Sequence, residues 1–202
     1  MSRDPARAAT QFFGGRVCLD FANTLDWRTS ADPQELIPDY AALIAWSGRR
    51  GTLPARAIAR LGLRAAADPV AAEGVMEQAF LLRSELWKIA DALRQQQAAD
   101  VAAANRMLAA LPPQPKLVRQ GHSYVHALQG ADLREPLWPV LWSLTAVLSS
   151  ADATRLGCCN ATGCGWFYVD ESPNRTRLWC SSEVCGNRER ARRAYAKRSS
   201  AR

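Results

Sequence analysis

Four of the six cysteines form two pairs with the same internal spacing. Four residues separate Cys159 from Cys164, four separate Cys180 from Cys185, and 15 residues lie between the two pairs. Two short-spaced pairs joined by a loop of this length are typical of tetrahedral zinc coordination by four thiolates. Because four thiolates leave no open position for a reacting water, the spacing predicts one structural Zn²⁺ per chain and no catalytic metal.

The two remaining cysteines have different surroundings. Cys158 adjoins Cys159 and could replace it as a ligand, although choosing Cys159 makes the two pairs match. Cys18 stands alone in an apolar stretch and is expected to be a small buried residue. The first 15 residues lack the apolar core of a signal peptide, and the longest apolar stretch, LWPVLWSLTAVL, is too short to span a bilayer. We therefore expect a cytoplasmic protein without disulfides.

The residues around the cysteine pairs predict a small treble-clef-like fold. Gly163 and Gly165 allow the chain to bend at the first pair, and Ser181 can cap a helix that carries the last ligand. Between the pairs, GWFYVD and RLWC are expected to form a hairpin around the turn ESPNRT. Trp166 and Trp179 are expected in the core of this finger, with base stacking as the alternative.

The excess of positive charge lies almost entirely in the last quarter of the chain. Residues 1–154 contain 16 Lys and Arg against 15 Asp and Glu, whereas residues 155–202 contain 10 against 4. Helical spacing after the last cysteine gives a broad basic face, and arginines can bind phosphate oxygens or guanine edges. The candidates for nucleic-acid binding are Asn187, Arg188, Arg190, Arg192, Arg193 and Lys197. A basic solvated tail is the alternative.

Some residues of this last helix have structural alternatives. Asn187 could satisfy backbone groups of the first turn or read adenine, and the structural role is favoured. Arg188 could pair with Asp170 across the finger. The side of the helix away from the basic face is expected to lie on the finger through an apolar strip of Ala191, Ala194 and Tyr195.

The rest of the chain shows mainly helical periodicity. A short strand over residues 16–19 is expected to run into a helical segment capped by Asp20. Helices are expected within residues 36–51, 54–66, 68–97, 100–111 and 135–156, and a hairpin within residues 116–120 and 123–130. The predicted fold class is therefore mainly α with a small β component: an α+β arrangement of a helical N-terminal domain with a short hairpin, followed by the finger.

One polar cluster stands out near the start of the helical region. Asp20, Asn23, Asp26 and Arg28 lie within nine residues of one another. They could form a binding site, although capping and ion pairing are the more common use of such a cluster.

Aromatic and histidine side chains offer two further candidates. Trp138 and Trp142, one helical turn apart, could line an apolar ligand pocket, with core packing as the alternative. His122 and His126 lack a nearby third metal ligand and are expected to be surface residues of the hairpin. No phosphate-binding loop, nucleophile elbow or acid pair in a recognisable context is present, so an enzyme is disfavoured.

The finger sequence is recognisable. Residues 155–198 resemble the CGNR zinc finger, whose name is spelled by Cys185, Gly186, Asn187 and Arg188; further matching residues are Cys164-Gly165-Trp166, Asp170, Ser172, Arg177 and Trp179-Cys180-Ser181. The chain departs from the family pattern at positions where Phe, Arg and Met are common, which are occupied by Tyr168, Leu178 and Ser182. None of these is a zinc ligand, but the missing arginine at Leu178 weakens any contact there.

The start of the chain resembles a second family. GGRVCLDFANTLDWR is similar to the beginning of the ABATE domain, which commonly precedes this finger in proteins described as stress-induced transcription regulators. The resemblance implies an ABATE-like helical domain over residues 1–154 and a CGNR-type finger with a basic C-terminal helix over residues 155–202.

These observations lead to one leading hypothesis and two alternatives. The leading hypothesis is a transcription regulator that binds DNA on the nucleoid through the finger, while the N-terminal domain senses a small-molecule effector or forms a homodimer. The first alternative is an RNA-binding protein. The second is a protein-interaction finger joined to a domain that binds a small molecule or acts as an enzyme.

Overall fold

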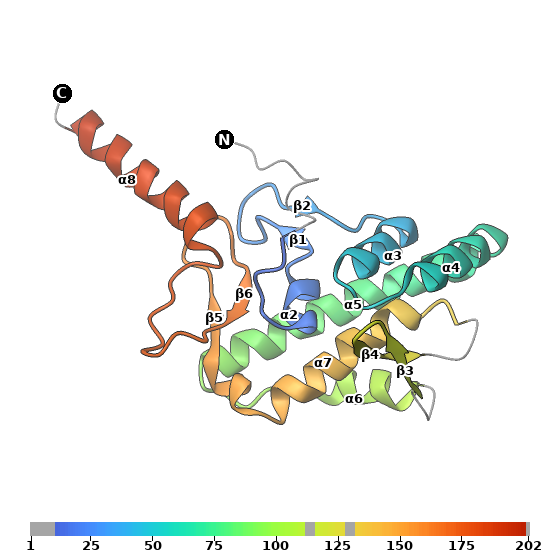
Figure 1. Ribbon diagram of the computed structural model, residues 1–202. Coiled ribbons are helices and arrows are strands. Elements are labelled where there is room, and N and C mark those ends of the chain that lie inside the picture. Colours follow the sequence, from blue (N-terminus) through green and yellow to red (C-terminus); the bar gives the residue numbers. More distant parts are fainter. Residues whose placement is uncertain (1–10, 112–115, 128–131, 201–202) are drawn as a thin grey trace.

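The computed structural model describes residues 11–111, 116–127 and 132–200 (Figure 1). Helices dominate the chain before the finger: α2 (Val17–Ala22), α3 (Tyr40–Arg49), α4 (Ala55–Ala67), α5 (Pro69–Arg94), α6 (Ala102–Ala109) and α7 (Trp138–Leu148). Two antiparallel strand pairs accompany them, formed by β1 (Leu25–Asp26) with β2 (Gln34–Glu35) and by β3 (Lys116–Gln120) with β4 (Ser123–Ala127). The predicted class, mainly α with a small β component, is confirmed, and so is the hairpin.

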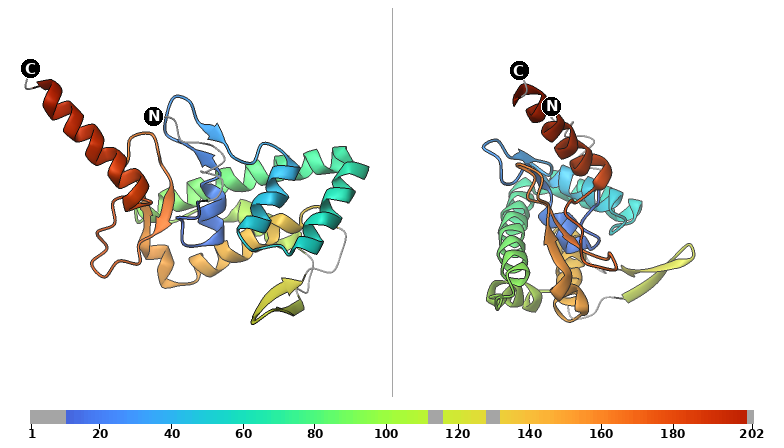
Figure 2. Two further views of the ribbon diagram at one scale, coloured as in Figure 1. Left: turned by 45° about the horizontal axis from the view of Figure 1, so that its top comes forward. Right: turned by 90° about the vertical axis from the view of Figure 1, so that its left-hand side faces the viewer.

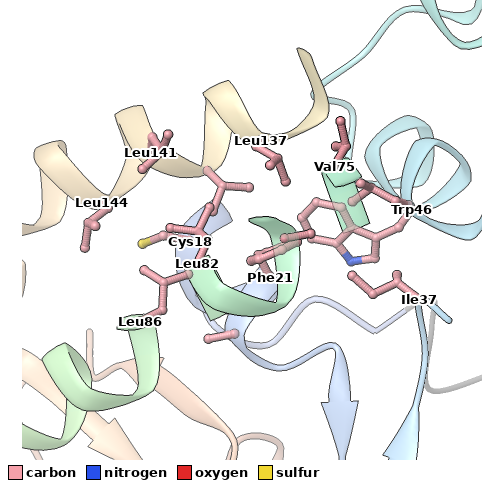
Figure 3. Close-up of a cluster of buried hydrophobic side chains, with 14 of the residues drawn as sticks. Cys18, Phe21, Ile37, Trp46, Val75, Leu82, Leu86, Leu137, Leu141 and Leu144 are labelled. Carbon is pink, nitrogen blue, oxygen red and sulfur yellow. The ribbon is translucent and has the colours of Figure 1, made fainter. Parts of the chain in front are cut away.

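The short helix α2 lies at the centre of the helical region and packs against α5 and α7. Figure 3 shows Cys18 and Phe21 of α2 among leucines of both neighbouring helices, close to Trp46 of α3. Cys18 and Phe21 are completely buried, so Cys18 is the small buried residue that the sequence predicts.

The strand predicted over residues 16–19 is wrong, because the helix begins directly after Arg16. The backbone amide of Asp20 donates to the carbonyl of Arg16 at 2.9 Å, and that of Asn23 donates to the carbonyl of Leu19 at 3.0 Å. Helix α2 is buried on nearly all sides, so it lacks the exposed polar positions by which a helix is recognised in a sequence. Asp20 belongs to the first turn and is not the N-cap.

The remaining helices agree with the predicted ranges to within a few residues, except at the end of α7. Asp68 caps α5 by accepting a hydrogen bond from the backbone amide of Ala71 at 3.0 Å. The helix predicted to reach residue 156 begins as a 3₁₀ turn, η1 (Glu135–Leu137), and α7 ends at Leu148. Ser150 then caps a second 3₁₀ turn, η2 (Ala151–Arg155), which leads into the finger.

The finger contains the third strand pair, β5 (Leu156–Cys158) with β6 (Phe167–Val169), in antiparallel register. The predicted pairing of GWFYVD with RLWC is therefore wrong, since the partner of β6 precedes the first zinc-ligand pair. Asp170 explains the difference: its carboxylate accepts hydrogen bonds from the backbone amides of Ser172 and Arg177, which turns the chain away before a second hairpin strand can form.

A π-helical turn, η3 (Ser182–Gly186), connects the finger to the last helix, α8 (Asn187–Ser200). Figures 1 and 2 show α8 running away from the rest of the molecule, whereas β5 and β6 lie beside the helical region. The finger core is thus attached to the helices, and its last helix projects from it.

Candidate metal centre and nucleic-acid interface

The sulfur atoms of Cys159, Cys164, Cys180 and Cys185 all lie within 4.8 Å of one another, and all four residues are buried. The Sγ–Sγ distances are 3.8 Å from Cys164 to Cys180, 3.4 Å from Cys180 to Cys185 and 3.7 Å from Cys185 to Cys164. A zinc ion about 2.3 Å from each of four tetrahedral sulfurs would set them roughly 3.8 Å apart. The donor set and its dimensions therefore fit zinc, and the finger holds one structural Zn²⁺.

Local backbone features bring the two cysteine pairs together. Gly163 and Gly165 have positive φ angles of 79° and 66°, which glycine adopts without strain, so both predicted bends are present. After the second pair begins, the hydroxyl of Ser181 accepts a hydrogen bond from the amide of Val184 at 3.2 Å, as a helix cap does. The following turn, η3, carries Cys185 back to the other three sulfurs.

Cys158 is not part of this cluster. It is the last residue of β5, and its side chain packs against the core of the helical region, whereas Cys159 is buried with the other ligands. Successive residues of an extended chain point to opposite sides, so only one of the two adjacent cysteines can reach the metal.

The small core of the finger is aromatic and is closed by one arginine. Trp166 is only 1% exposed and is a core residue, as the sequence predicts; Trp179 is half-buried beside it. The Arg177 guanidinium lies over the Tyr168 ring, 4.2 Å from its centroid, and donates to backbone carbonyls of Phe13, Val169, Trp179 and Cys180. Hydrogen bonding of this kind fixes the loops in place of a larger apolar core.

The polar cluster near the start of the chain joins the helical region to the finger. The side-chain amide of Asn23 donates to the carbonyl of Phe167 and accepts from its amide, both at 2.8 Å. Arg28 donates twice to the carbonyl of Gly165 and stacks on the Phe167 ring at 4.5 Å. Asp20 binds the Gly14 amide and forms an ion pair with Arg50 at 2.7 Å, and buried Asp26 accepts from the Trp27 amide. Each of these contacts is structural.

The first turn of α8 is also held in place. Asn187 donates to the carbonyl of Glu183 at 2.7 Å and accepts from Arg190 at 2.6 Å. Arg188 stacks on Trp27 at 4.2 Å and donates to the carbonyl of Thr162. The predicted pair of Arg188 with Asp170 does not form, because the Asp170 carboxylate binds Ser172 and Arg177. Desolvation opposes ionisation of Asp170, but these hydrogen bonds outweigh it and lower the pKa of the carboxyl group.

Buried Glu189 also attaches the first turn of α8 to the finger. Its carboxylate is buried, accepts from the amide of Thr162 at 3.0 Å and pairs with Arg192 at 2.8 Å. Although desolvation opposes it, the hydrogen bonds from Arg192 and Thr162 lower the pKa of Glu189. Arg192 is therefore partly committed to a contact within the finger.

The remainder of α8 is exposed on every side up to residue 199. The predicted apolar strip does not lie on the finger: Ala191 and Ala194 are exposed, and Tyr195 is 76% exposed. Helix α8 points away from the finger, so only its first turn packs against other residues. The side chains of Arg193 and Lys197 are exposed and make no hydrogen bond or ion pair within the described part of the chain.

Comparison with known families agrees with both parts of this architecture. Residues 15–151 match the ABATE family, described as "putative stress-induced transcription regulator", and residues 155–198 match the CGNR zinc finger. The chain belongs to the ABATE family. No curated protein gives a match to the chain. Neither family description names an enzyme.

The two tryptophans proposed for a ligand pocket in the ABATE domain have different positions. Trp138 is buried and lines a cavity of about 380 Å³ between α5, α6 and α7, together with apolar residues of all three helices. Trp142, one turn later, is half-buried and does not line this cavity. The two tryptophans therefore point in different directions from α7, and only Trp138 faces the cavity. The cavity is also lined by residues of α5 and α6, which the sequence did not indicate.

The histidines lie on the ABATE domain's hairpin. His122 is exposed in the turn between β3 and β4, and the side chain of His126 falls outside the described residues. Among the residues that can be placed, the four cysteines form the metal-binding cluster. None of the helices found over residues 11–111 and 132–200 is long and apolar enough to cross a membrane.

Proposed function

We propose that this ABATE protein is a cytoplasmic transcription regulator that binds duplex DNA through the exposed part of α8. The observation that carries the proposal is the projecting basic helix, mounted on a zinc site and covered by nothing in the described chain. A helix of 14 residues is about 21 Å long, and the major groove of DNA admits a helix.

The cations of α8 are not equivalent in this proposal. At 100° per residue, Arg190, Arg193 and Lys197 lie within an arc of about 60°, so they can face one groove together. Within this set, Arg190 also donates to Asn187 and to the carbonyl of Ser182, whereas the side chains of Arg193 and Lys197 are exposed. Arg188 and Arg192 are engaged by Trp27 and Glu189 and orient the helix. The DNA-contacting set is therefore narrower than the six candidates taken from the sequence.

DNA is favoured over RNA by the position of the aromatic residues. Recognition of single-stranded RNA relies on aromatic side chains that stack on bases beside a basic surface. Trp166 is buried, and exposed Tyr195 lies on the side of α8 opposite to Arg193 and Lys197. A basic helix without an aromatic platform on the same face is better suited to a duplex groove.

The test removes two positive charges from α8 and compares the salt dependence of DNA binding. The zinc-loaded chain is expected to bind duplex genomic fragments with an affinity that falls steeply with salt. The variant R193Q/K197Q should keep its zinc and helix content, while the slope of log K against log salt falls by about 1.8, since each phosphate contact contributes about 0.9.

The matched control removes two charges from the ABATE domain. R56Q/K88Q changes exposed residues of α4 and α5 and should leave the slope unchanged. Equal effects of the two variants, or a native chain without salt-dependent affinity, would refute the proposal. If single-stranded RNA competed with duplex DNA preferentially, the nucleic acid in the proposal would be RNA and not DNA.

A further inference from the structure

The cavity of the ABATE domain is formed by one face of each of three helical segments. Helix α5 and residues 134–141 each contribute four residues at spacing i, i+3, i+4, i+7, and α6 with the two residues that follow it contributes five, at the same spacing with i+8 added. The apolar floor is formed by Leu82 of α5, Met107 of α6 and Trp138 of α7. Three such faces would normally close on one another, because protein interiors are packed without voids of this size.

Helix α6 explains why the space stays open. The helix and the residues directly after it present Ala103 and Ala110 to the cavity on either side of Met107, so two of the five lining positions of this segment have only a methyl side chain. The resulting volume of about 380 Å³ lies within the range of roughly 300–1,000 Å³ that small-molecule sites occupy.

The rim of the cavity has an uncompensated positive charge. Glu85 is paired with Lys88 at 2.7 Å, and Arg134 is held by Asp132 at 2.6 Å. The side chain of Arg106 makes no hydrogen bond or ion pair with any residue that the structure describes. An adjoining hollow shares Gln78 and Arg134 with the cavity.

That adjoining hollow has balanced charges. Arg64 and Arg134 line it together with Asp68 and Asp132, and Arg64 attracts the carboxylate of Asp132 electrostatically. Asp68 faces the same hollow, but its carboxylate already caps α5 through the Ala71 amide. The positive charge of Arg106 at the rim is therefore the feature that favours a negative group next to the apolar interior.

We propose that this cavity binds an organic anion with an apolar body, such as a medium-chain or aromatic carboxylate. The apolar body lies against Trp138, Leu82 and Met107, and the carboxylate pairs with Arg106 at the rim. The inference concerns the ABATE domain alone and stands or falls independently of DNA binding by α8.

Displacement of a fluorescent probe tests the class of ligand. The zinc-loaded full chain is titrated with anilinonaphthalene sulfonate, and decanoate, decanol and decyltrimethylammonium are then added as competitors of equal chain length. Decanoate should displace the probe at the lowest concentration and the cation at the highest, because only the anion gains the contact with Arg106. Equal competition by all three would overturn the assignment of an anion.

Two matched pairs of variants locate the site. Ala103→Phe fills the cavity and should lower the affinity for the probe at least about tenfold, whereas Ala102→Phe, at the neighbouring exposed position, should not change this affinity. Arg106→Gln should lower the affinity for decanoate about fivefold and leave the affinity for decanol unchanged. Arg56→Gln, which removes a charge from an exposed position of α4, is its control. Native affinity in Ala103→Phe would show that the probe binds elsewhere and would end the proposal.

Discussion

The ABATE domain and the zinc finger are stabilised in different ways. The domain buries a continuous set of aliphatic and aromatic side chains around α2, as Figure 3 shows in part. The finger buries four cysteines with Trp166 and Tyr168, and supplements them with the hydrogen bonds of Arg177. A core of this size cannot fold by hydrophobic burial alone, so the finger depends on its metal whereas the domain does not.

Strand β6 belongs to both cores. Phe167 and Val169 point into the core of the ABATE domain, while Trp166 and Tyr168 are buried in the finger. Alternation along an extended chain allows this division, because successive side chains point to opposite faces. The comparison therefore teaches that the two parts have separate sources of stability and one shared strand.

Loss of zinc is expected to have the largest effect. Cys180→Ser should release the metal and unfold residues 155–198, because zinc contributes roughly 10–16 kcal/mol to the folding of such sites. The ABATE domain should stay helical but lose about 3–6 kcal/mol, since Phe167 and Val169 leave its core and each large buried side chain contributes about 1.5–3 kcal/mol. Zinc content, circular dichroism and thermal melting measure the three effects.

Cys158→Ser is the matched control for this experiment. Cys158 adjoins a ligand but lies outside the cluster, so the variant should retain one zinc per chain. Stoichiometric zinc in Cys180→Ser, or an unchanged melting temperature of the ABATE domain, would contradict the shared-strand interpretation.

Disruption of the contact at the outer edge of β6 is expected to have the next largest effect. Asn23→Ala removes the side chain that satisfies both backbone groups of Phe167, and each buried polar group left unpaired costs about 1–3 kcal/mol. We expect a loss of roughly 2–6 kcal/mol in the free energy of unfolding, measured in urea. Asn105→Ala, at an exposed position of α6, is the control and should change it by less than about 0.5 kcal/mol. Similar losses in both variants would show that the Asn23 contact is not needed.

The sequence alone was sufficient for features that depend on neighbours in the chain. Four zinc ligands, the bends at Gly163 and Gly165 and the long helix α5 all follow from local spacing, and all are found in the structure. The apolar run from Trp166 to Val169 also held a signal that was missed: a strand without alternating polar residues is buried on both faces, and β6 is.

Contacts between distant segments could not be predicted in this way. Asn23 and Phe167 are 144 positions apart, and Arg28 and Gly165 are 137 positions apart. No spacing rule connects such residues, so the sequence favoured capping and ion pairing for the polar cluster but could not show which segments the cluster joins. The pairing of β6 with β5 was missed for a related reason. The sequence favoured a hairpin partner directly after β6, but the hydrogen bonds of Asp170 turn the chain there and prevent that hairpin.

The smallest expected effect concerns Arg188, which connects α8 to the ABATE domain through Trp27. Arg188→Gln, Trp27→Leu and the double variant form a thermodynamic cycle, and a cation–π contact at a partly exposed site gives a coupling of about 0.5–1 kcal/mol. Coupling below the error of urea unfolding would mean that the stacking contributes nothing.

The variant Arg188→Gln also distinguishes a residue that orients α8 from one that contacts DNA. Because Arg188 is bound to Trp27 and Thr162, Arg188→Gln should leave the salt slope of DNA binding nearly native, in contrast to R193Q/K197Q. A slope reduced by about 0.9 would instead assign Arg188 to a phosphate, and the first turn of α8 would then belong to the DNA-binding surface together with its exposed end.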